Sequence, residues 1–227
     1  MHIAIVSDIH ANLEALLALQ DVLENADKVV CLGDYVGYYC QVNEALDFVR
    51  SLDALCLLGN HDHFLLHGCP PSANQAVCFG VEHADRVIDT GHRAWLGTLP
   101  WTWGGELGGR SWLLSHGSPW NPLSDYLYAD SPRLDALAGF SYELLAFGQT
   151  HRPTLSWDTR PRIINPGSVG QSRHAAGRAC AVTVDTEALQ CDLIERPYDS
   201  RRVIDHARRH GAGAWVLKHL GGQMGEA

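Results

Sequence analysis

Hydrophobic residues occur along the chain in short runs, and each run ends in one small residue followed by a polar one. The first run is Ile3-Ala4-Ile5-Val6, followed by Ser7 and Asp8. Further runs cover 29–32, 54–58, 112–114 and 144–147. Short apolar runs bounded by glycines predict buried strands, and in sheets flanked by helices the ligands gather beyond the carboxyl ends of those strands. We therefore expect these strand ends to deliver their polar residues to one place.

Between the first runs, the spacing of apolar residues predicts helices. Residues 42–49 follow the i, i+3, i+4, i+7 pattern, and Asn12 is placed to cap a helix that runs to about Leu23. A third helix is expected to begin with Ser72 and Gln75 in capping-box spacing, and a short fourth to begin at Thr90. The resulting β-α-β-α-β order predicts a parallel core with right-handed crossovers.

The second half of the chain predicts mainly strands. They are expected at 101–103, 111–115, 162–164, 179–184 and 190–195. The first two form a hairpin, and so do the last two. Ser131 before Pro132 marks a further helix start. Helices followed by strands, twice over, predict an α/β fold: a four-layer αββα sandwich of two mixed β-sheets flanked by helices.

Length, charge and cysteine usage limit the class of protein. At 227 residues and 46% hydrophobic, the chain suits a single domain over 1–227, with 200–220 as C-terminal covering helices. The net charge of -9 argues against stable nucleic-acid binding. Seven cysteines without paired spacing favour reduced thiols and a cytoplasmic location. The opening apolar run is too short for a signal peptide or a membrane span, and the oligomeric state stays open.

The polar residues at the strand ends form motifs in a fixed order. They are Asp8-x-His10, Gly33-Asp34-x-x-Gly37, Gly59-Asn60-His61-Asp62, His116-Gly117 and Gly148-x-x-His151. In this order the motifs resemble those of the calcineurin-like metallophosphoesterases. Residues 33–38 and 165–171 further resemble the small, single-domain bacterial YfcE-like phosphodiesterases. Several motifs in fixed order are far more specific than any one of them.

The resemblance implies the sandwich fold and a dinuclear metal centre. The implied ligands are Asp8, His10 and His151 on the first ion, Asn60 and His116 on the second, and Asp34 as the bridge. In-line attack by a metal-bridging hydroxide would hydrolyse a phosphate ester. His61 would stabilise the developing charge or protonate the leaving oxygen, a task suited to a group that titrates near neutrality.

Gln149 departs from the family pattern. Most members have Gly-His-x-His where this chain has Gly148-Gln149-Thr150-His151, so the second ion loses an imidazole. The amide oxygen of Gln149 can still ligate, as a weaker and harder donor. We therefore expect a looser second site that favours Mn²⁺, with Fe, Zn, Ni and Mg as alternatives. The other interpretation is that Gln149 only hydrogen-bonds a metal-bound water.

Two further residues are candidates for substrate binding. Arg152 follows His151 and can contact a phosphate or form a surface salt bridge. Tyr38 follows Asp34 and can line a substrate cleft or pack in the core. The expected partner is a small phosphate ester, and a nucleotide is one candidate. We expect no interaction with a membrane.

These residues predict a metal-dependent phosphoesterase with a preference for diesters. A nucleotide or dinucleoside polyphosphate phosphatase is the nearest alternative. A non-catalytic metal-binding scaffold is the alternative of another class, because the resemblance extends to the retromer trafficking subunit. The intact His61 favours an enzyme, since a scaffold has no use for an acid beside the metals. The imidazole missing at Gln149 favours the scaffold.

Overall fold

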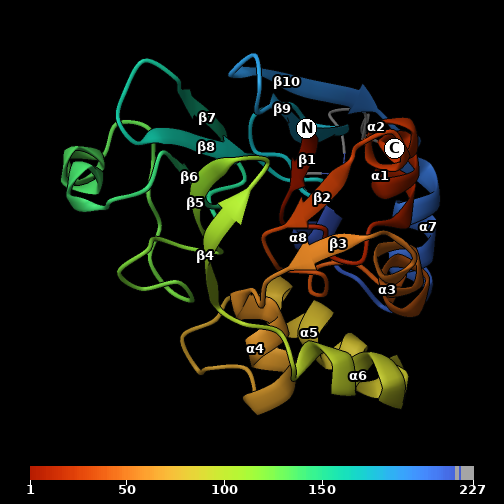
Figure 1. Cartoon of the computed structure of the whole chain (residues 1–227). Coiled ribbons are helices and arrows are strands. Elements are labelled where there is room, and N and C mark those ends of the chain that lie inside the picture. Colours follow the sequence, from red (N-terminus) through yellow and green to blue (C-terminus); the bar gives the residue numbers. More distant parts are fainter. Residues whose placement is uncertain (218–219, 221–227) are drawn as a thin grey trace.

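The computed structural model describes residues 1–217 and 220, and it contains two five-stranded sheets (Figure 1). The strands of the first sheet, in spatial order, are β10 (Gln190–Pro197), β9 (Arg178–Asp185), β1 (His2–Val6), β2 (Lys28–Cys31) and β3 (Ala54–Cys56). The last three run parallel, as the alternation of strands and helices predicted. β9 runs antiparallel to β1 and forms a hairpin with β10.

The second sheet has the same mixed character. Its strands, in spatial order, are β4 (Thr102–Leu107), β5 (Arg110–Ser115), β6 (Leu144–Ala146), β8 (Arg162–Pro166) and β7 (Pro153–Ser156). The central three are parallel, and the two edge strands are antiparallel to their neighbours. The parallel strands of both sheets therefore have carboxyl ends at which a site can be assembled.

Strand β1 shows how the layers are held together. Successive side chains of a strand point to opposite faces. Ile3 and Ile5 accordingly pack between the two sheets, in a cluster that includes Trp112 of β5. Ala4 and Val6 pack instead against the helices on the other face. One strand thus contributes to two cores, and the predicted sandwich of two mixed sheets flanked by helices is confirmed.

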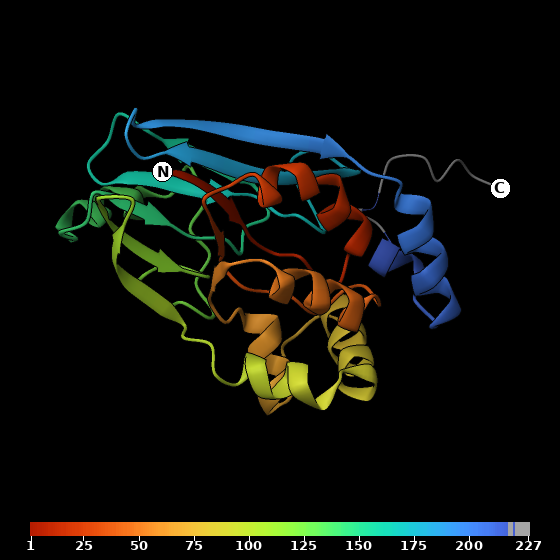
Figure 2. The same ribbon diagram turned by 45° about the vertical axis from the view of Figure 1, so that its right-hand side comes forward.

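The helices cover the outer faces of the sandwich. They are α1 (Leu13–Ala18), α2 (Gln20–Glu24), α3 (Val42–Ser51), α4 (Asn60–His67), α5 (Gln75–Val87), α6 (Thr90–Leu96), α7 (Ser200–Arg209) and α8 (Ala214–Leu217). In Figures 1 and 2, α1, α3 and α7 lie on the outer side of the first sheet. The outer face of the second sheet is covered by the short 3₁₀-helix η1 (Pro132–Gly139), with Leu137 in the core cluster there.

Some helix boundaries differ from the prediction. The helix expected from Asn12 to about Leu23 is interrupted at Leu19, which is fully buried and ends α1. The predicted start of α5 at Ser72 is wrong. Asn74 caps this helix instead, and its side-chain oxygen accepts a hydrogen bond of 3.0 Å from the backbone N–H of Val77. Helix α4 and strand β7 were not predicted.

The described part of the C-terminal segment contains helices α7 and α8. α7 packs near α1, and the buried Val203 and Ala207 form its inner face. Residues 218, 219 and 221–227 lie outside the described residues, so the domain extent of 1–227 stays a prediction. Within the described residues, no helix combines the length and the apolar character needed to cross a membrane.

Candidate active site

The carboxyl ends of strands from both sheets meet at one buried cluster of polar side chains. Asp8 and His10 follow β1, Asp34 follows β2, Asn60 and His61 open α4 just after β3, His116 follows β5, and Gln149 and His151 follow β6. All eight residues are buried. The structure therefore brings together every metal-ligand candidate that the sequence offered, along with His61.

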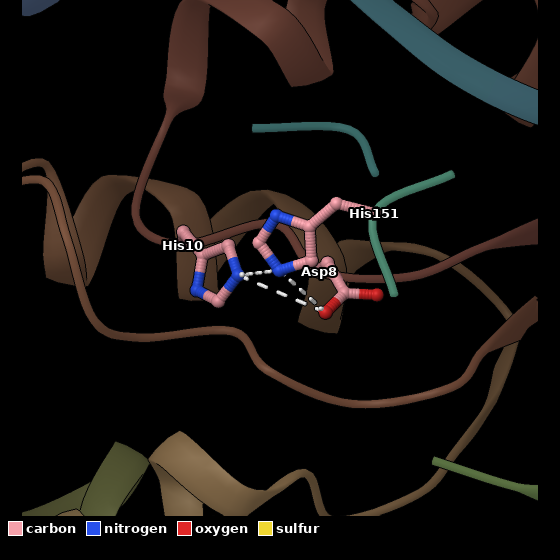
Figure 3. Close-up of side chains that lie close together, drawn as sticks. All are labelled: Asp8, His10 and His151. Carbon is pink, nitrogen blue, oxygen red and sulfur yellow. Dashed lines mark hydrogen bonds and ion pairs between the residues drawn. The ribbon is translucent and has the colours of Figure 1, made fainter. Parts of the chain in front are cut away.

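The first half of the cluster consists of Asp8, His10 and His151, which point toward one another (Figure 3). Oδ1 of Asp8 lies 3.1 Å from Nε2 of His151 and 3.7 Å from Nε2 of His10. The two Nε2 atoms are themselves only 3.1 Å apart. Two basic nitrogens and a carboxylate oxygen at these separations form a donor set that one divalent ion can satisfy.

The second half of the cluster is built around Asp34 and His116. Nε2 of His116 lies 3.3 Å from Oδ2 of Asp34 and 3.0 Å from Oδ1 of Asn60. The same Oδ2 of Asp34 is 3.9 Å from Nε2 of His10 in the first half. One carboxylate oxygen of Asp34 thus lies between the two halves of the cluster.

Each of the three imidazoles in the donor set is oriented by a backbone carbonyl. Nδ1 of His10 lies 3.0 Å from the oxygen of Val36, and Nδ1 of His151 lies 2.8 Å from that of Gln171. For His116 the partner is the carbonyl of Leu32, at 3.0 Å. Because a carbonyl only accepts, Nδ1 carries the proton in each ring. Nε2 is then the nitrogen that faces the cluster, as in metal-ligating histidines.

The backbone is strained where it carries these side chains. Asp8, His10, Asp34, Gln149 and His151 have φ values of 57°, 54°, 60°, 64° and 58°. Residues with a Cβ seldom adopt this left-handed region, and each instance costs on the order of 1–3 kcal/mol. Strain gathered on these candidate ligands indicates that the chain turns sharply after β1, β2 and β6 in order to aim the side chains inward.

Small residues permit this convergence. A Cβ at Gly59 would lie 2.1 Å from Oδ1 of Asp34, and a Cβ at Gly148 would lie 2.0 Å from Oγ of Ser7 and 2.8 Å from Oδ2 of Asp8. No larger residue fits at either position without displacing a candidate ligand. The glycines at 59 and 148 are therefore required by the close approach of neighbouring loops.

Two oxygen atoms of the cluster lack hydrogen-bond partners among the described residues. They are Oδ1 of Asp8 and Oε1 of Gln149, both buried. A buried acceptor without a partner is costly. A cation would satisfy both atoms, so the residues present fit the divalent ions that the donor set suggests. Oε1 of Gln149 lies close to Gly117, which directly follows His116.

The charges of the cluster depend on its burial and on its internal pairs. Burial acts to raise the pKa of Asp34, but the neighbouring histidines, His116 foremost, outweigh it and lower that pKa to about 2. The same balance holds the pKa of Asp8 well below its usual range, with His151 as the main partner. Both carboxylates are therefore ionised near neutral pH. Burial lowers the pKa of His10 far below its ordinary value, so this ring is neutral.

His116 behaves differently from His10. Burial alone would lower its pKa, but the attraction of Asp34 and the hydrogen bond to it outweigh burial and raise the pKa to about 9. In the metal-free protein His116 is therefore an imidazolium that offsets part of the carboxylate charge. A metal ion must displace this proton in order to bind Nε2.

Asp62 is a positioning residue that the sequence interpretation left without a role. Its Oδ2 accepts the backbone N–H groups of Asp34 at 2.8 Å and Gly59 at 3.0 Å. Its Oδ1 accepts those of Tyr35 and Val36 at 2.9 and 3.2 Å. Burial and the Asp34 carboxylate nevertheless raise the pKa of Asp62 to about 7. The capping-box spacing from Gly59 to Asp62 was the signal that could have identified it.

The segment 165–171 supports the ligand loops from behind. Oγ of Ser168 donates to the carbonyl of Asp8 at 2.7 Å, and Nδ2 of Asn165 donates to the carbonyl of Gly148 at 2.9 Å. The carbonyl of Gln171 orients His151, as described above. Ser168 is fully buried and bonded to the backbone. This segment therefore positions the site, and its sequence signal was the glycine-rich turn after Pro166.

A cleft of about 420 Å³ opens onto the cluster and contains one of the two predicted substrate contacts. Tyr38, Asn60, His61 and Gln149 line it. Arg152, the other candidate, lies on a neighbouring hollow with Tyr128 and is exposed. The arginine that does line the cleft is Arg173. No motif marked Arg173, because only the fold brings it next to the ligands.

Fold and site together define a metal-dependent phosphoesterase, and comparison with known proteins agrees. The model of the calcineurin-like phosphoesterase superfamily domain matches residues 1–188. The chain belongs to this superfamily, as its motifs predicted, and it is a hydrolase that acts on phosphoester bonds. Enzymes of this family use divalent metal ions. The narrower resemblance to the YfcE-like branch stays a prediction.

Similar proteins match nearly the whole chain. An uncharacterised protein from Methanocaldococcus jannaschii is 27% identical over 96% of either chain. The crystal structure of a metallophosphoesterase from Sphaerobacter thermophilus is 27% identical and has a TM-score of 0.81, with 97% of this chain and 98% of that chain covered. A hypothetical protein from Pyrococcus horikoshii, 21% identical, has the same fold with a TM-score of 0.84 and the same coverage of 97% and 98%.

We expect Asp62→Asn to lower the free energy of unfolding by about 2 kcal/mol, because an amide nitrogen cannot accept the backbone N–H groups that one carboxylate oxygen now binds. Urea denaturation of the metal-free protein measures this effect. Asp53→Asn is the matched control, since the side chain of Asp53 is 88% exposed. Equal stability of the two variants would contradict the positioning role.

Metal binding should release a proton from His116. Because the pKa of His116 is raised to about 9, its ring is protonated in the metal-free protein below that pH. The apparent metal affinity should therefore rise about tenfold per pH unit between about pH 7 and 8 and level off above about pH 9. Calorimetry in buffers of different ionisation enthalpy counts the released protons. An affinity independent of pH over this range would contradict the assignment.

Proposed function

We propose that the protein is a phosphodiesterase that holds two divalent ions, Mn²⁺ foremost, in the cluster around Asp34. The observation that carries this proposal is the position of Oδ2 of Asp34, which lies 3.9 Å from Nε2 of His10 and 3.3 Å from Nε2 of His116. A carboxylate oxygen shared by two donor sets is what a dinuclear centre requires.

The donor sets divide naturally between two ions. Asp8, His10 and His151 would hold one, and Asn60, His116 and Gln149 the other, with Asp34 common to both. When bound, two such ions supply Lewis acidity, which activates water and neutralises the charge on the phosphoryl oxygens. Oxygen donors predominate in the second set, which supports Mn²⁺ over Zn²⁺ there.

His61 is the candidate catalytic residue, because it lines the cleft beside the cluster and lies outside both of these donor sets, although its ring is also close to His10 and Asp34. Its backbone N–H donates to Oδ1 of Asp34 at 2.8 Å, and its Nε2 lies 3.8 Å from Oδ2 of the same carboxylate. Nδ1 of His61 is buried and has no hydrogen-bond partner among the described residues. The ring is therefore held in place with Nδ1 packed against Gly37 and Nε2 on the side of Asp34.

The protonation of His61 suits this role. Burial, opposed in part by Asp34, lowers its pKa, so in the free protein the ring is neutral near pH 7 and donates through one N–H. A phosphate group in the cleft brings negative charge close to the ring and raises that pKa. His61 can then stabilise the charge that develops on the phosphate and pass a proton to the leaving oxygen.

The lining of the cleft favours diesters. Phe64, Tyr126 and Tyr128 provide apolar surface for organic groups on the phosphate. Among the described residues that line the cleft, Arg173 is the one lysine or arginine. A monoester carries more negative charge than a diester near neutral pH. A cleft with much aromatic surface and one cationic side chain therefore suits the diester better.

Hydrolysis of bis(p-nitrophenyl) phosphate by metal-stripped protein should depend on added Mn²⁺ and should exceed that of p-nitrophenyl phosphate. His61→Ala should lower the rate by about 100-fold or more, because the group that assists the leaving oxygen is gone. His174→Ala serves as the control, since the side chain of His174 is 54% exposed and outside the cluster. If no metal restores hydrolysis of either substrate, the proposal of a phosphodiesterase is wrong.

Gln149→His tests whether the second ion is held through the amide oxygen. An added imidazole should strengthen the second metal site and shift its preference toward Zn²⁺, whereas Gln149→Ala should weaken it by about tenfold. Metal titration followed by calorimetry resolves the two binding steps. Unchanged second-site affinity in both variants would show that Gln149 is not a ligand.

A further inference from the structure

Two exposed tyrosines stand at the mouth of the cleft with their rings nearly parallel. The ring planes of Tyr126 and Tyr128 make an angle of 14°, and the centroids are 6.0 Å apart. The two residues are 45% and 39% exposed, although both line the cleft that contains His61. Large aromatic surfaces are usually buried in a protein that has a full core. Here two of them line the cleft that opens onto the candidate metal ligands.

Arg173 lies in the same cleft and is tied to a candidate metal ligand. Its backbone N–H donates to the carbonyl of His151 at 3.0 Å, while Nδ1 of His151 donates to the carbonyl of Gln171 at 2.8 Å. These two hydrogen bonds fix the segment 171–173 relative to the metal cluster. The backbone of Arg173 is thereby anchored beside a candidate metal ligand, and its side chain lines the cleft.

The charge of Arg173 is available to a ligand. In the part of the chain that the structure describes, no carboxylate lies within ion-pair distance of its guanidinium group, and Nη2 donates only a long hydrogen bond of 3.4 Å to the hydroxyl of Tyr38. Arg173 also affects the pKa of Tyr126. Burial raises the pKa of the Tyr126 phenol, and Arg173 acts in the opposite direction. The cation and the tyrosine pair are therefore neighbours in one cleft.

We propose that this cleft recognises a nucleotide, with the base stacked on Tyr126 and Tyr128 and a phosphate bound by Arg173 beside the metal ligands. A nucleotide has a planar aromatic base, which can stack on the tyrosines, and an anionic phosphate, which can bind the arginine. Base stacking on aromatic side chains and charge-assisted hydrogen bonds from arginine are both substantial contributions to binding. The cleft volume of about 420 Å³ suits a small molecule.

This inference rests on the proposed function, since it names the substrate class of the same site. Binding can nevertheless be measured without turnover. The suitable probes are the 5′-methylenephosphonate analogues of AMP and of ribose 5-phosphate, which lack a hydrolysable ester bond and differ only in the base. Titration calorimetry of the Mn²⁺-supplied protein with both probes isolates the contribution of the base.

The adenosine probe should bind about tenfold more tightly than the ribose probe, because only the former can stack. In Tyr126→Leu/Tyr128→Leu this ratio should fall to near unity. In the matched variant Tyr126→Phe/Tyr128→Phe it should persist, since the rings remain. Equal binding of the two probes by the unaltered protein, or a ratio that survives the leucine variant, would overturn the proposal.

Arg173→Gln separates the phosphate contact from the base contact. Both probes should bind about tenfold or more weakly to this variant, because a charged donor to the phosphonate is lost, while their ratio stays the same. Arg173→Lys should recover part of the affinity. If Arg173→Gln binds both probes as tightly as the unaltered protein does, the assignment of Arg173 to the phosphate is wrong.

A parallel assay of bis(p-nitrophenyl) phosphate hydrolysis distinguishes failure of this inference from failure of the proposed function. Turnover without preference for the adenosine probe would leave a phosphodiesterase that does not select nucleotides. Preference for the adenosine probe without any turnover would leave a nucleotide-binding cleft that lacks the proposed activity. Each result rejects one statement and retains the other.

Discussion

The carboxylate of Asp34 is the constraint on which the rest of the structure depends. One oxygen is held by the backbone N–H of His61, and the other lies between imidazoles that come from different sheets. For that oxygen to be reached from both sides, the loops after β1, β2 and β5 must approach to within a few ångströms. The packing of the two sheets, the glycines at 33, 59 and 148, and the left-handed backbone of the ligands all serve this approach.

Such an arrangement is unfavourable in isolation. Buried carboxylates, rings with facing nitrogens and strained φ values all raise the free energy of the folded chain. The opposing contribution comes from cores that exclude water on both faces of β1 and from hydrogen bonds such as those accepted by Asp62. The site therefore lies at a place where the two cores and these hydrogen bonds hold the backbone in position. Bound divalent ions would relieve much of the remaining cost.

The strand ends could be predicted from sequence because each depends on a local pattern, an apolar run closed by a small residue. The parallel order of the first strands and the helix over α3 were predictable for the same reason. Helix α4 was not, since its first turn carries polar site residues in place of a periodic apolar face. The sequence also could not place Arg173 or Tyr126 in the cleft. Their positions depend on contacts with residues far away in the chain, and local sequence patterns do not predict such contacts.

The order in which the site residues occur along the chain affects its assembly during synthesis. Asp8 emerges first, yet the ring that faces it belongs to His151, and that ring is oriented by the carbonyl of Gln171. The carbonyl of Asp8 is in turn held by Ser168. A growing chain that has completed the first three strands therefore has several ligands but no finished centre. The donor set of Asp8, His10 and His151 is therefore complete only when synthesis has passed Gln171, long after Asp8 itself has been made.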